Sequence, residues 1–185
     1  MSFTELAQTI LRDAKILDEF IAANDLPRPS LDVSGPAMTQ FTTKESLHAH
    51  AAVLANTHKL FYLAQGPAAP WMGTLNGPLG DAMTTAAVYH FGIADHVPLE
   101  GEASFEDIAE KSGLALRDFK SVVRYAMTNY IFCEPRPGFI KHTASSKVLA
   151  GNKLIKSLAG VGCHEQLPAL DKVFHCGADS WQRSG

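Results

Sequence analysis

Histidine is the side chain best suited to moving protons near neutral pH, and this chain has eight histidines in 185 residues. His164 lies in the polar stretch Gly162-Cys-His-Glu-Gln-Leu-Pro168, which interrupts an otherwise apolar region. It is our candidate for a general base or for a hydrogen-bond partner of a substrate. The alternative is structural: these residues begin a helix, and the negative charge of Glu165 stabilises that helix at the positive, N-terminal end of the helix dipole. Cys163 directly precedes His164, which is a poor geometry for a nucleophile and its base.

The remaining histidines do not indicate a metal site. His48, His50 and His58 fall on one predicted helix, where only His50 and His58 share a face, and no Asp or Cys stands at a compatible spacing. We expect His48 and His50 at the surface and no bound metal. His142 precedes a helix predicted near Ser145 and either supports the start of that helix or contacts a substrate.

Composition limits the class of protein. With 46% hydrophobic and 19% charged residues, the chain is expected to bury a core, as one domain or as one domain with a helical extension. The formal net charge of −3 disfavours non-specific binding to nucleic acid. The sequence shows neither a leader pattern nor a long apolar run, so we expect a soluble, cytoplasmic protein that does not bind membranes. An odd number of cysteines favours a reducing compartment. They are Cys133, Cys163 and Cys176.

The first part, residues 1–80, is predicted to be a helical dimerisation arm. Ser2 and Glu5 have capping-box spacing before a helix that runs to about residue 24. A proline-rich connector over 26–36 follows, and a second capping box at Thr42 and Glu45 opens a helix over about 43–64. The loop after it holds two large apolar side chains that either fill the core or line an apolar pocket or a dimer contact. They are Trp71 and Met72.

Residues 81–150 are predicted to form a winged helix-turn-helix. After a helix over about 81–91, Ser104 caps a short helix that Gly113 ends in a left-handed conformation. A longer helix over about 116–130 and a β-hairpin over 131–142 complete the motif. A helix is expected at 145–150. Residues 151–185 form a C-terminal helical segment, with a helix expected at about 154–174 that Gly160, Gly162 and Pro168 interrupt. The whole chain is expected to be one mainly α structural unit, a helical bundle with one small β-hairpin.

A winged helix often binds DNA through its second helix. Here Arg117, Lys120 and Arg124 share one face of that helix, and the wing adds Arg136 and Lys141. The net negative charge and the long apolar helices on both sides of the motif oppose this interpretation. A DNA-binding regulator therefore remains only an alternative.

The run FGIADHVPLEGEASFEDIAEKSGLALRDFKSVVRYAMTNYIFCEPRPGFIKHTASSKVLA resembles the N-terminal region of fungal S-adenosylmethionine-dependent O-methyltransferases of secondary metabolism. The resemblance extends from about residue 5 to 176 and includes the proline-rich connector. It implies a winged helix that does not bind DNA, but interlocks with its counterpart in a homodimer and helps to roof the active site. The catalytic part of such enzymes is a separate Rossmann-like domain of roughly 200 residues. The matching positions are Phe91 to Ile93, Val97, Pro98, Glu100 to Glu102, Ser104 to Ala109, Arg124, Ala126 to Thr128, Ile131, Phe132, Glu134, Pro135, Gly138, His142 to Ala144 and Ser146.

The resemblance also implies that residues 162–168 lie against the acceptor pocket, where His164 is the catalytic candidate. A small aromatic or polyketide-like molecule is the expected ligand. The candidate substrate-binding residues are Trp71, Met72, Met127, His142, Cys163, His164 and Leu167.

A site for S-adenosylmethionine needs a glycine-rich turn after a strand, with an acidic residue further on. The nearest pattern is Gly160-Val-Gly162, and it follows a helical stretch. We therefore expect no cofactor in this chain and no methyl transfer by it; S-adenosylmethionine would be bound only by a C-terminal domain in a longer form. The predicted function is dimerisation and substrate capping. The alternative is a stand-alone truncated protein that catalyses a cofactor-free cyclisation or dehydration of a polyketide-type intermediate.

Overall fold

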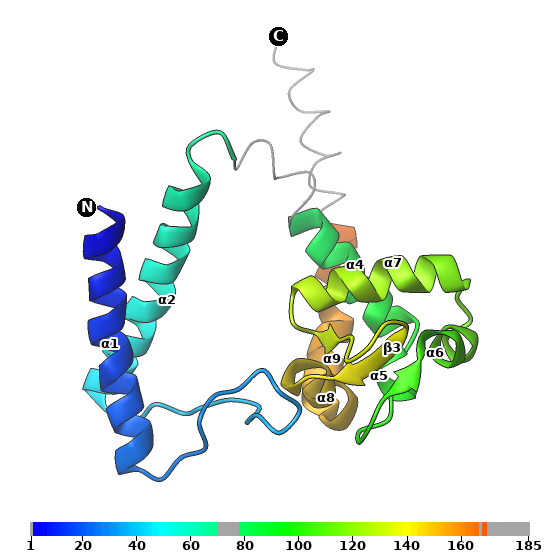
Figure 1. Ribbon diagram of the computed structural model, residues 1–185, viewed down its shortest axis with the longest axis horizontal. Coiled ribbons are helices and arrows are strands. Elements are labelled where there is room, and N and C mark those ends of the chain that lie inside the picture. The colour runs from blue at the N-terminus through cyan, green and yellow to red at the C-terminus, as the bar shows by residue number, and fades with distance from the viewer. Residues whose placement is uncertain (1, 70–77, 167, 170–185) are drawn as a thin grey trace. The chain divides into compact units, whose positions relative to one another are not determined.

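The computed structural model describes residues 2–69, 78–166 and 168–169 (Figure 1). The described part is mostly helical and contains one small three-stranded antiparallel sheet, which confirms the predicted fold class. The chain divides into two compact units. The first comprises Met1–Ser30 with Gly35–Pro78, and the second comprises Leu31–Ser34 with Leu79–Gly185.

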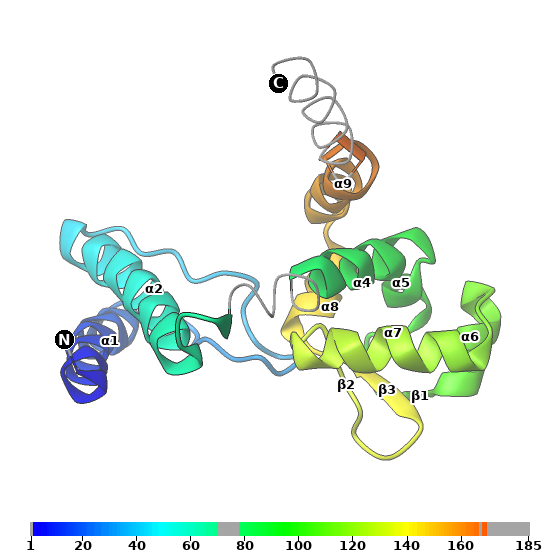
Figure 2. The same cartoon turned by 90° about the horizontal axis from the view of Figure 1, so that it is seen from above.

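The first unit is built from two long helices, α1 (Phe3–Ala23) and α2 (Lys44–Gln65), which lie side by side and run in opposite directions (Figures 1 and 2). The predicted capping box between Ser2 and Glu5 is present in both directions. The box at α2 lies one residue later than predicted. Thr43, not Thr42, is the N-cap, because its extended backbone lets its hydroxyl accept from the Ser46 N–H at 3.1 Å while the Ser46 hydroxyl accepts from the Thr43 N–H at 3.2 Å.

The pair of α1 and α2 has a thin core. Among the described residues of this unit, only three apolar side chains are buried: Leu6, Ile21 and Ala49. Many of the large apolar side chains on the two helices are instead exposed, and they include Phe3, Leu11, Leu47, Leu54, Phe61 and Leu63.

The first helix of the second unit is α4 (Pro78–His90), which corresponds to the helix predicted over about 81–91. The short α5 (Ile93–His96) follows, and the sequence did not predict it. Next come α6 (Phe105–Ser112) and α7 (Leu116–Thr128). As predicted, Ser104 caps α6 by accepting from the Asp107 N–H, and Gly113 ends it with a φ of 69°. That left-handed conformation is the reason for glycine at this position.

A small sheet lies next to α7 (Figure 2). Its strands are β1 (Ala103–Ser104), β2 (Phe132–Cys133) and β3 (Phe139–His142), in the order β1-β3-β2 with both pairings antiparallel. The predicted hairpin is therefore β2 with β3, and β1 is an addition. Twelve buried apolar residues form the core of this unit: Val88, Ile93, Ala94, Val97, Phe105, Ile108, Ala109, Phe119, Val123, Ala126, Phe132 and Ile140.

The chain continues into α8 (Ala144–Gly151), α9 (Lys153–Val161) and a π-helical turn, η1 (Gly162–Gln166). The side chain of Asn152 starts α9 by accepting from two backbone N–H groups. The helix predicted over 154–174 is interrupted at Gly162, which is one of the predicted interruptions, and its last residues lie outside the described part of the chain. No helix in the described ranges has both the length and the apolar character that crossing a bilayer requires.

Candidate functional site

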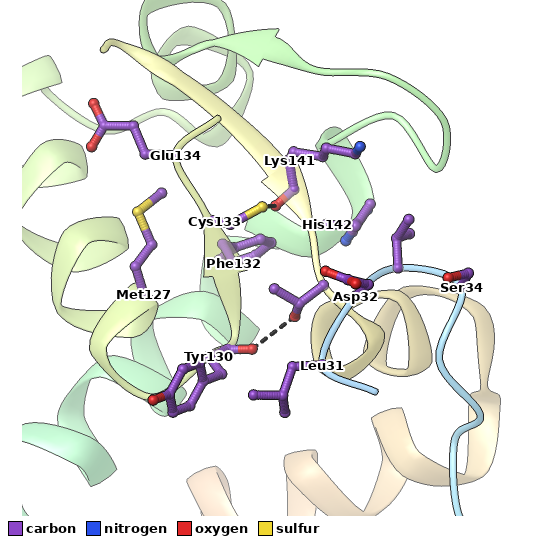
Figure 3. Close-up of a pocket in the computed structure, with 12 residues that line it drawn as sticks. Leu31, Asp32, Ser34, Met127, Tyr130, Phe132, Cys133, Glu134, Lys141 and His142 are labelled. Carbon is purple, nitrogen blue, oxygen red and sulfur yellow. Dashed lines mark hydrogen bonds between the residues drawn. The ribbon is translucent and has the colours of Figure 1, made fainter. Parts of the chain in front are cut away.

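A cavity of about 710 Å³ opens in the second unit, where the hairpin, the C-terminal end of α7 and the segment Leu31–Ser34 meet (Figure 3). Apolar side chains form much of its wall: Leu31, Val33, Met127, Tyr130 and Phe132. A cavity of this size and character is suited to a small, largely apolar molecule.

The segment Leu31–Ser34 is attached to α8 through its backbone. The Leu31 carbonyl accepts from the Ala144 N–H at 3.1 Å, and the Val33 carbonyl accepts from the Lys147 ammonium group at 3.1 Å. These two bonds place a piece of the proline-rich connector along one side of the cavity.

The link between α7 and β2 also borders the cavity, through Tyr130. Tyr130 has a φ of 56°, a left-handed conformation that is uncommon outside glycine. The Thr143 hydroxyl lies 2.7 Å from the Tyr130 carbonyl and 2.8 Å from the Ile131 carbonyl, so its one proton is shared between two adjacent carbonyls of this link. The Tyr130 side chain remains exposed at the edge of the cavity.

His142 forms part of the cavity wall, but its side chain is only 1% exposed. Its Nε2 lies 3.1 Å from the Val97 carbonyl, which can only accept, so Nε2 carries the proton. Its Nδ1 lies 2.9 Å from the Ser146 hydroxyl and accepts from it. Burial lowers the pKa of His142, and the charge of Lys147 lowers it further against the opposing effect of the Val97 carbonyl. His142 is therefore a neutral, fully bonded group that supports the start of α8, whose N-cap is Thr143.

Besides His142 and Thr143, the cavity is lined by the polar residues Asp32, Ser34, Cys133, Glu134 and Lys141. The Glu134 carboxylate is held by the Arg124 guanidinium at 3.1 and 3.3 Å and by the Gly138 N–H at 2.7 Å, and these hydrogen bonds lower its pKa. Burial raises the pKa of the Cys133 thiol, which keeps it protonated at neutral pH. Lys141 is half-buried at the rim, and no carboxylate of the described residues lies within ion-pair distance of it. The cavity therefore combines an apolar wall with charged groups of both signs, Lys141 and the carboxylates of Asp32 and Glu134, and its thiol is not activated as a nucleophile.

The structure brings together only some of the predicted site residues. Met127 and His142 line the cavity, whereas Cys163 and His164 lie in η1 and are not among its lining residues. The exposed His164 ring packs edge-on against Tyr89, with 5.6 Å between ring centroids. Trp71, Met72 and Leu167 lie outside the described residues.

Some residues of the cavity were not predicted. Leu31 and Val33 come from a connector that has no pattern of its own, and only the fold brings it against α8. The left-handed conformation of Tyr130 has no signal in the sequence either, because that region usually belongs to glycine or asparagine. Groups of three or more potential metal ligands are absent from the described ranges.

The described residues do not fit S-adenosylmethionine in the way that a nucleotide-type fold would hold it. Such a fold places the cofactor at the ends of parallel strands, beside a glycine-rich turn. The strands described here are short and antiparallel, and Gly160 and Gly162 lie in α9 and η1, not after a strand.

Comparison with solved structures defines the class of fold. The chain matches OxaC with a TM-score of 0.63 and 11% identity, over 85% of this chain and 35% of OxaC. It matches LaPhzM with a TM-score of 0.50 and 23% identity, over 57% of this chain and 32% of that one. The fold is that of the helical N-terminal domain of O-methyltransferases. No protein-family model matches the chain.

Curated relatives place the chain within that class. Its alignment with the O-methyltransferase pyvH of Aspergillus violaceofuscus is 29% identical over 182 residues. That alignment covers 98% of this chain and 41% of pyvH. Its alignment with the O-methyltransferase bik3 of Gibberella fujikuroi is 33% identical over 149 residues. That alignment covers 80% of this chain and 33% of bik3. The protein is a homologue of fungal O-methyltransferases and spans about a third to two fifths of the length of these relatives.

Proposed function

We propose that these residues form the dimerisation and substrate-capping domain of an O-methyltransferase-like protein of fungal secondary metabolism. The homology above supports the family. The observation that supports dimerisation most strongly is the thin core of the α1–α2 pair. With Leu6, Ile21 and Ala49 as the only buried apolar side chains among its described residues, this unit gains too little from apolar burial to offset the entropy of ordering two long helices.

A second copy would supply the missing contacts. Leu47, Leu54 and Phe61 on α2 are all exposed, and an exposed apolar surface of this kind usually marks an interface. In a two-fold symmetric dimer the same surface is buried on both copies, so one apolar face is enough. The second unit has its own core and does not need such help.

We further propose that α6, α7 and the hairpin form a winged helix that packs and does not bind DNA. Two of the three basic residues on α7 are engaged within the chain: Lys120 lies 3.6 Å from Glu106, and Arg124 is paired with Glu134. Ammonium and guanidinium groups in such pairs are less available to DNA phosphates.

Dimerisation is tested by measuring the mass of the chain by light scattering at 1–100 µM. We expect a dimer, and we expect Leu54→Gln to weaken it at least tenfold because a polar amide would replace an apolar contact. The control is Leu99→Gln, an equally exposed leucine in a loop of the second unit. A wild-type chain that stays monomeric at 100 µM would overturn the proposal.

Substrate capping is tested at the cavity. We expect 1,8-dihydroxynaphthalene, a probe for flat aromatic molecules, to bind at micromolar to millimolar concentrations in titration calorimetry. Met127→Trp should fill the cavity and weaken binding at least tenfold. Met83→Trp, on the exposed side of α4, is the matched control and should leave binding unchanged. Equal binding by both variants would exclude this cavity as the site.

In this proposal the 185 residues alone do not bind S-adenosylmethionine. Calorimetric titration with that compound should show no binding, and saturable binding would contradict the proposal. A cofactor-free cyclisation or dehydration is not favoured by the described residues, because His164 does not line the cavity and both ring nitrogens of His142 are engaged.

A further inference from the structure

Tyr130 has a left-handed backbone that its residue type does not favour. Its φ is 56°, and Asp25 and Tyr130 are the only non-glycine residues with a positive φ in the described ranges. Aspartate tolerates this conformation because its short polar side chain can bond locally, whereas a bulky side chain is strained there. Strain of this kind in a structure is a reason to look for a function of the residue that carries it.

The strained residue ends α7 in a Schellman motif. The Tyr130 N–H donates to the Met127 carbonyl at 3.1 Å, and the next N–H, that of Ile131, donates to the Ala126 carbonyl at the same distance. A third contact comes from the Thr143 hydroxyl, which lies 2.7 Å from the Tyr130 carbonyl. These bonds fix the backbone of a position that glycine usually occupies, because glycine adopts a positive φ without steric cost.

The end of α6 shows the same motif with glycine. There the Gly113 N–H donates to the Glu110 carbonyl at 3.1 Å. The next N–H, that of Leu114, donates to the Ala109 carbonyl at 3.0 Å. Two helices of one unit thus end in the same pattern of hydrogen bonds. Glycine at position 130 would therefore end α7 equally well, and the local structure does not require a tyrosine.

Packing does not explain the tyrosine either. Tyr130 is 60% exposed and does not belong to the apolar core of the second unit, so burial offsets little of the strain. The residue does, however, line the cavity (Figure 3). Strained residues are concentrated at ligand sites, and an aromatic ring on a fixed backbone loses little freedom when it stacks on a flat molecule.

We propose that the ring of Tyr130 stacks on the aromatic molecule that the cavity binds, and that Tyr130 determines the preference of the cavity for flat ligands. This inference rests on the proposed substrate capping and adds a contact residue to it. Met127 and Phe132 supply apolar wall, and Tyr130 supplies an exposed aromatic face. Because the strain lowers stability while the ring strengthens binding, substitution of Tyr130 should change stability and binding in opposite directions.

The first test measures thermal unfolding and calorimetric binding of 1,8-dihydroxynaphthalene for three variants of Tyr130 in the full chain. Tyr130→Gly should raise the unfolding temperature by about 2–5 °C, because glycine relieves the strain. It should weaken binding about tenfold, because the stacking face is lost. Tyr130→Asn, which tolerates the backbone but has no aromatic ring, should weaken binding to the same extent. Tyr130→Phe keeps the ring and should bind within about twofold of the wild type.

Gly113→Tyr is the matched control. It places the same ring at the same position of the motif, where a Cβ meets open space and the residue does not line the cavity. We expect it to lower the unfolding temperature by about 2–5 °C and to leave binding unchanged. If Gly113→Tyr does not destabilise the chain, a tyrosine is not strained in this motif and the inference is overturned.

The outcomes separate this inference from the proposed function. A wild-type chain that does not bind the probe would refute both. Binding that Met127→Trp weakens, but Tyr130→Gly and Tyr130→Asn do not, refutes only the role of Tyr130. Weaker binding by Tyr130→Gly alone would assign the effect to backbone freedom and overturn the inference. If loss of the ring instead weakens self-association in light scattering and leaves binding unchanged, the ring belongs to a protein interface and the inference is wrong.

Discussion

Replacing His142 by glutamine tests the buried hydrogen bonds that connect the hairpin, α5 and α8. The glutamine amide nitrogen can still donate to the Val97 carbonyl, as Nε2 does at 3.1 Å. The bond at Nδ1, where Ser146 donates at 2.9 Å, is lost. One buried hydrogen bond and some packing are therefore removed, which should cost about 1–2 kcal/mol of unfolding free energy at pH 7.5.

The pH dependence of the unfolding free energy tests His142 more sharply than the loss of stability at one pH. The pKa of His142 is lowered in the folded chain by burial, so the unfolded chain binds this proton more readily than the folded chain does. The contribution of neutral His142 to the unfolding free energy is complete above the pKa of histidine in the unfolded chain, about 6.5. This contribution is lost as the pH falls below that value. Between pH 7.5 and 5.5 the loss from this one group is at most about 1.4 kcal/mol. Protonation would also force the Ser146 hydroxyl to stop donating to Nδ1.

The assay is urea unfolding followed by circular dichroism at pH 7.5 and 5.5. The wild type should lose more stability on acidification than His142→Gln does, by up to about 1.4 kcal/mol, because glutamine does not titrate. His58→Gln, which changes an exposed histidine on α2, should behave as the wild type. If acidification affects the wild type and His142→Gln equally within about 0.3 kcal/mol, His142 is not the neutral buried group described above.

Three further predictions concern single positions. Thr43→Ala should cost about 1 kcal/mol in urea unfolding because it removes the cap of α2, whereas Thr42→Ala should cost nothing; the opposite order would contradict the cap assignment. Gly113→Ala should destabilise the chain by about 1 kcal/mol because its φ is 69°, while Gly151→Ala, in α8 with open space around it, should stabilise it by about 0.5 kcal/mol; equal effects would contradict the left-handed turn. Iodoacetamide labelling of Cys133, followed by peptide mass, should reach half its maximal rate above pH 8.5, since burial raises this pKa; a lower midpoint would indicate an activated thiol.

Local signals predicted most of the helices. Ser2 with Glu5, Ser104 and Gly113 mark their helix ends through bonds within one turn, and such bonds are visible in a sequence. Two adjacent threonines at the start of α2 give nearly the same pattern, so the cap was assigned one residue early. The strand β1 is only two residues long and depends on pairing with β3, which no local pattern reveals.

The candidate site depends more on contacts between distant segments. Met127 and His142 could be named from the sequence. The cavity that they share, however, forms only when Leu31–Ser34 binds α8, and the bonded residues Val33 and Lys147 are 114 positions apart in the sequence. Tyr130 was missed because a left-handed helix end usually carries glycine, so this residue type has no local signal. Only the structure shows that it ends α7 beside the cavity.

Hydrogen exchange measured at several protein concentrations tests the central claim, that a second copy completes the α1–α2 pair. We predict that backbone amides of α1 and α2 are protected at 100 µM and exchange much faster at 1 µM or below, as the dimer dissociates. Amides around Phe119 and Val123, in the core of the second unit, should not change with dilution. If the protection of α1 and α2 is the same at every concentration while the chain remains a monomer, the two helices are stable by themselves and the account is wrong.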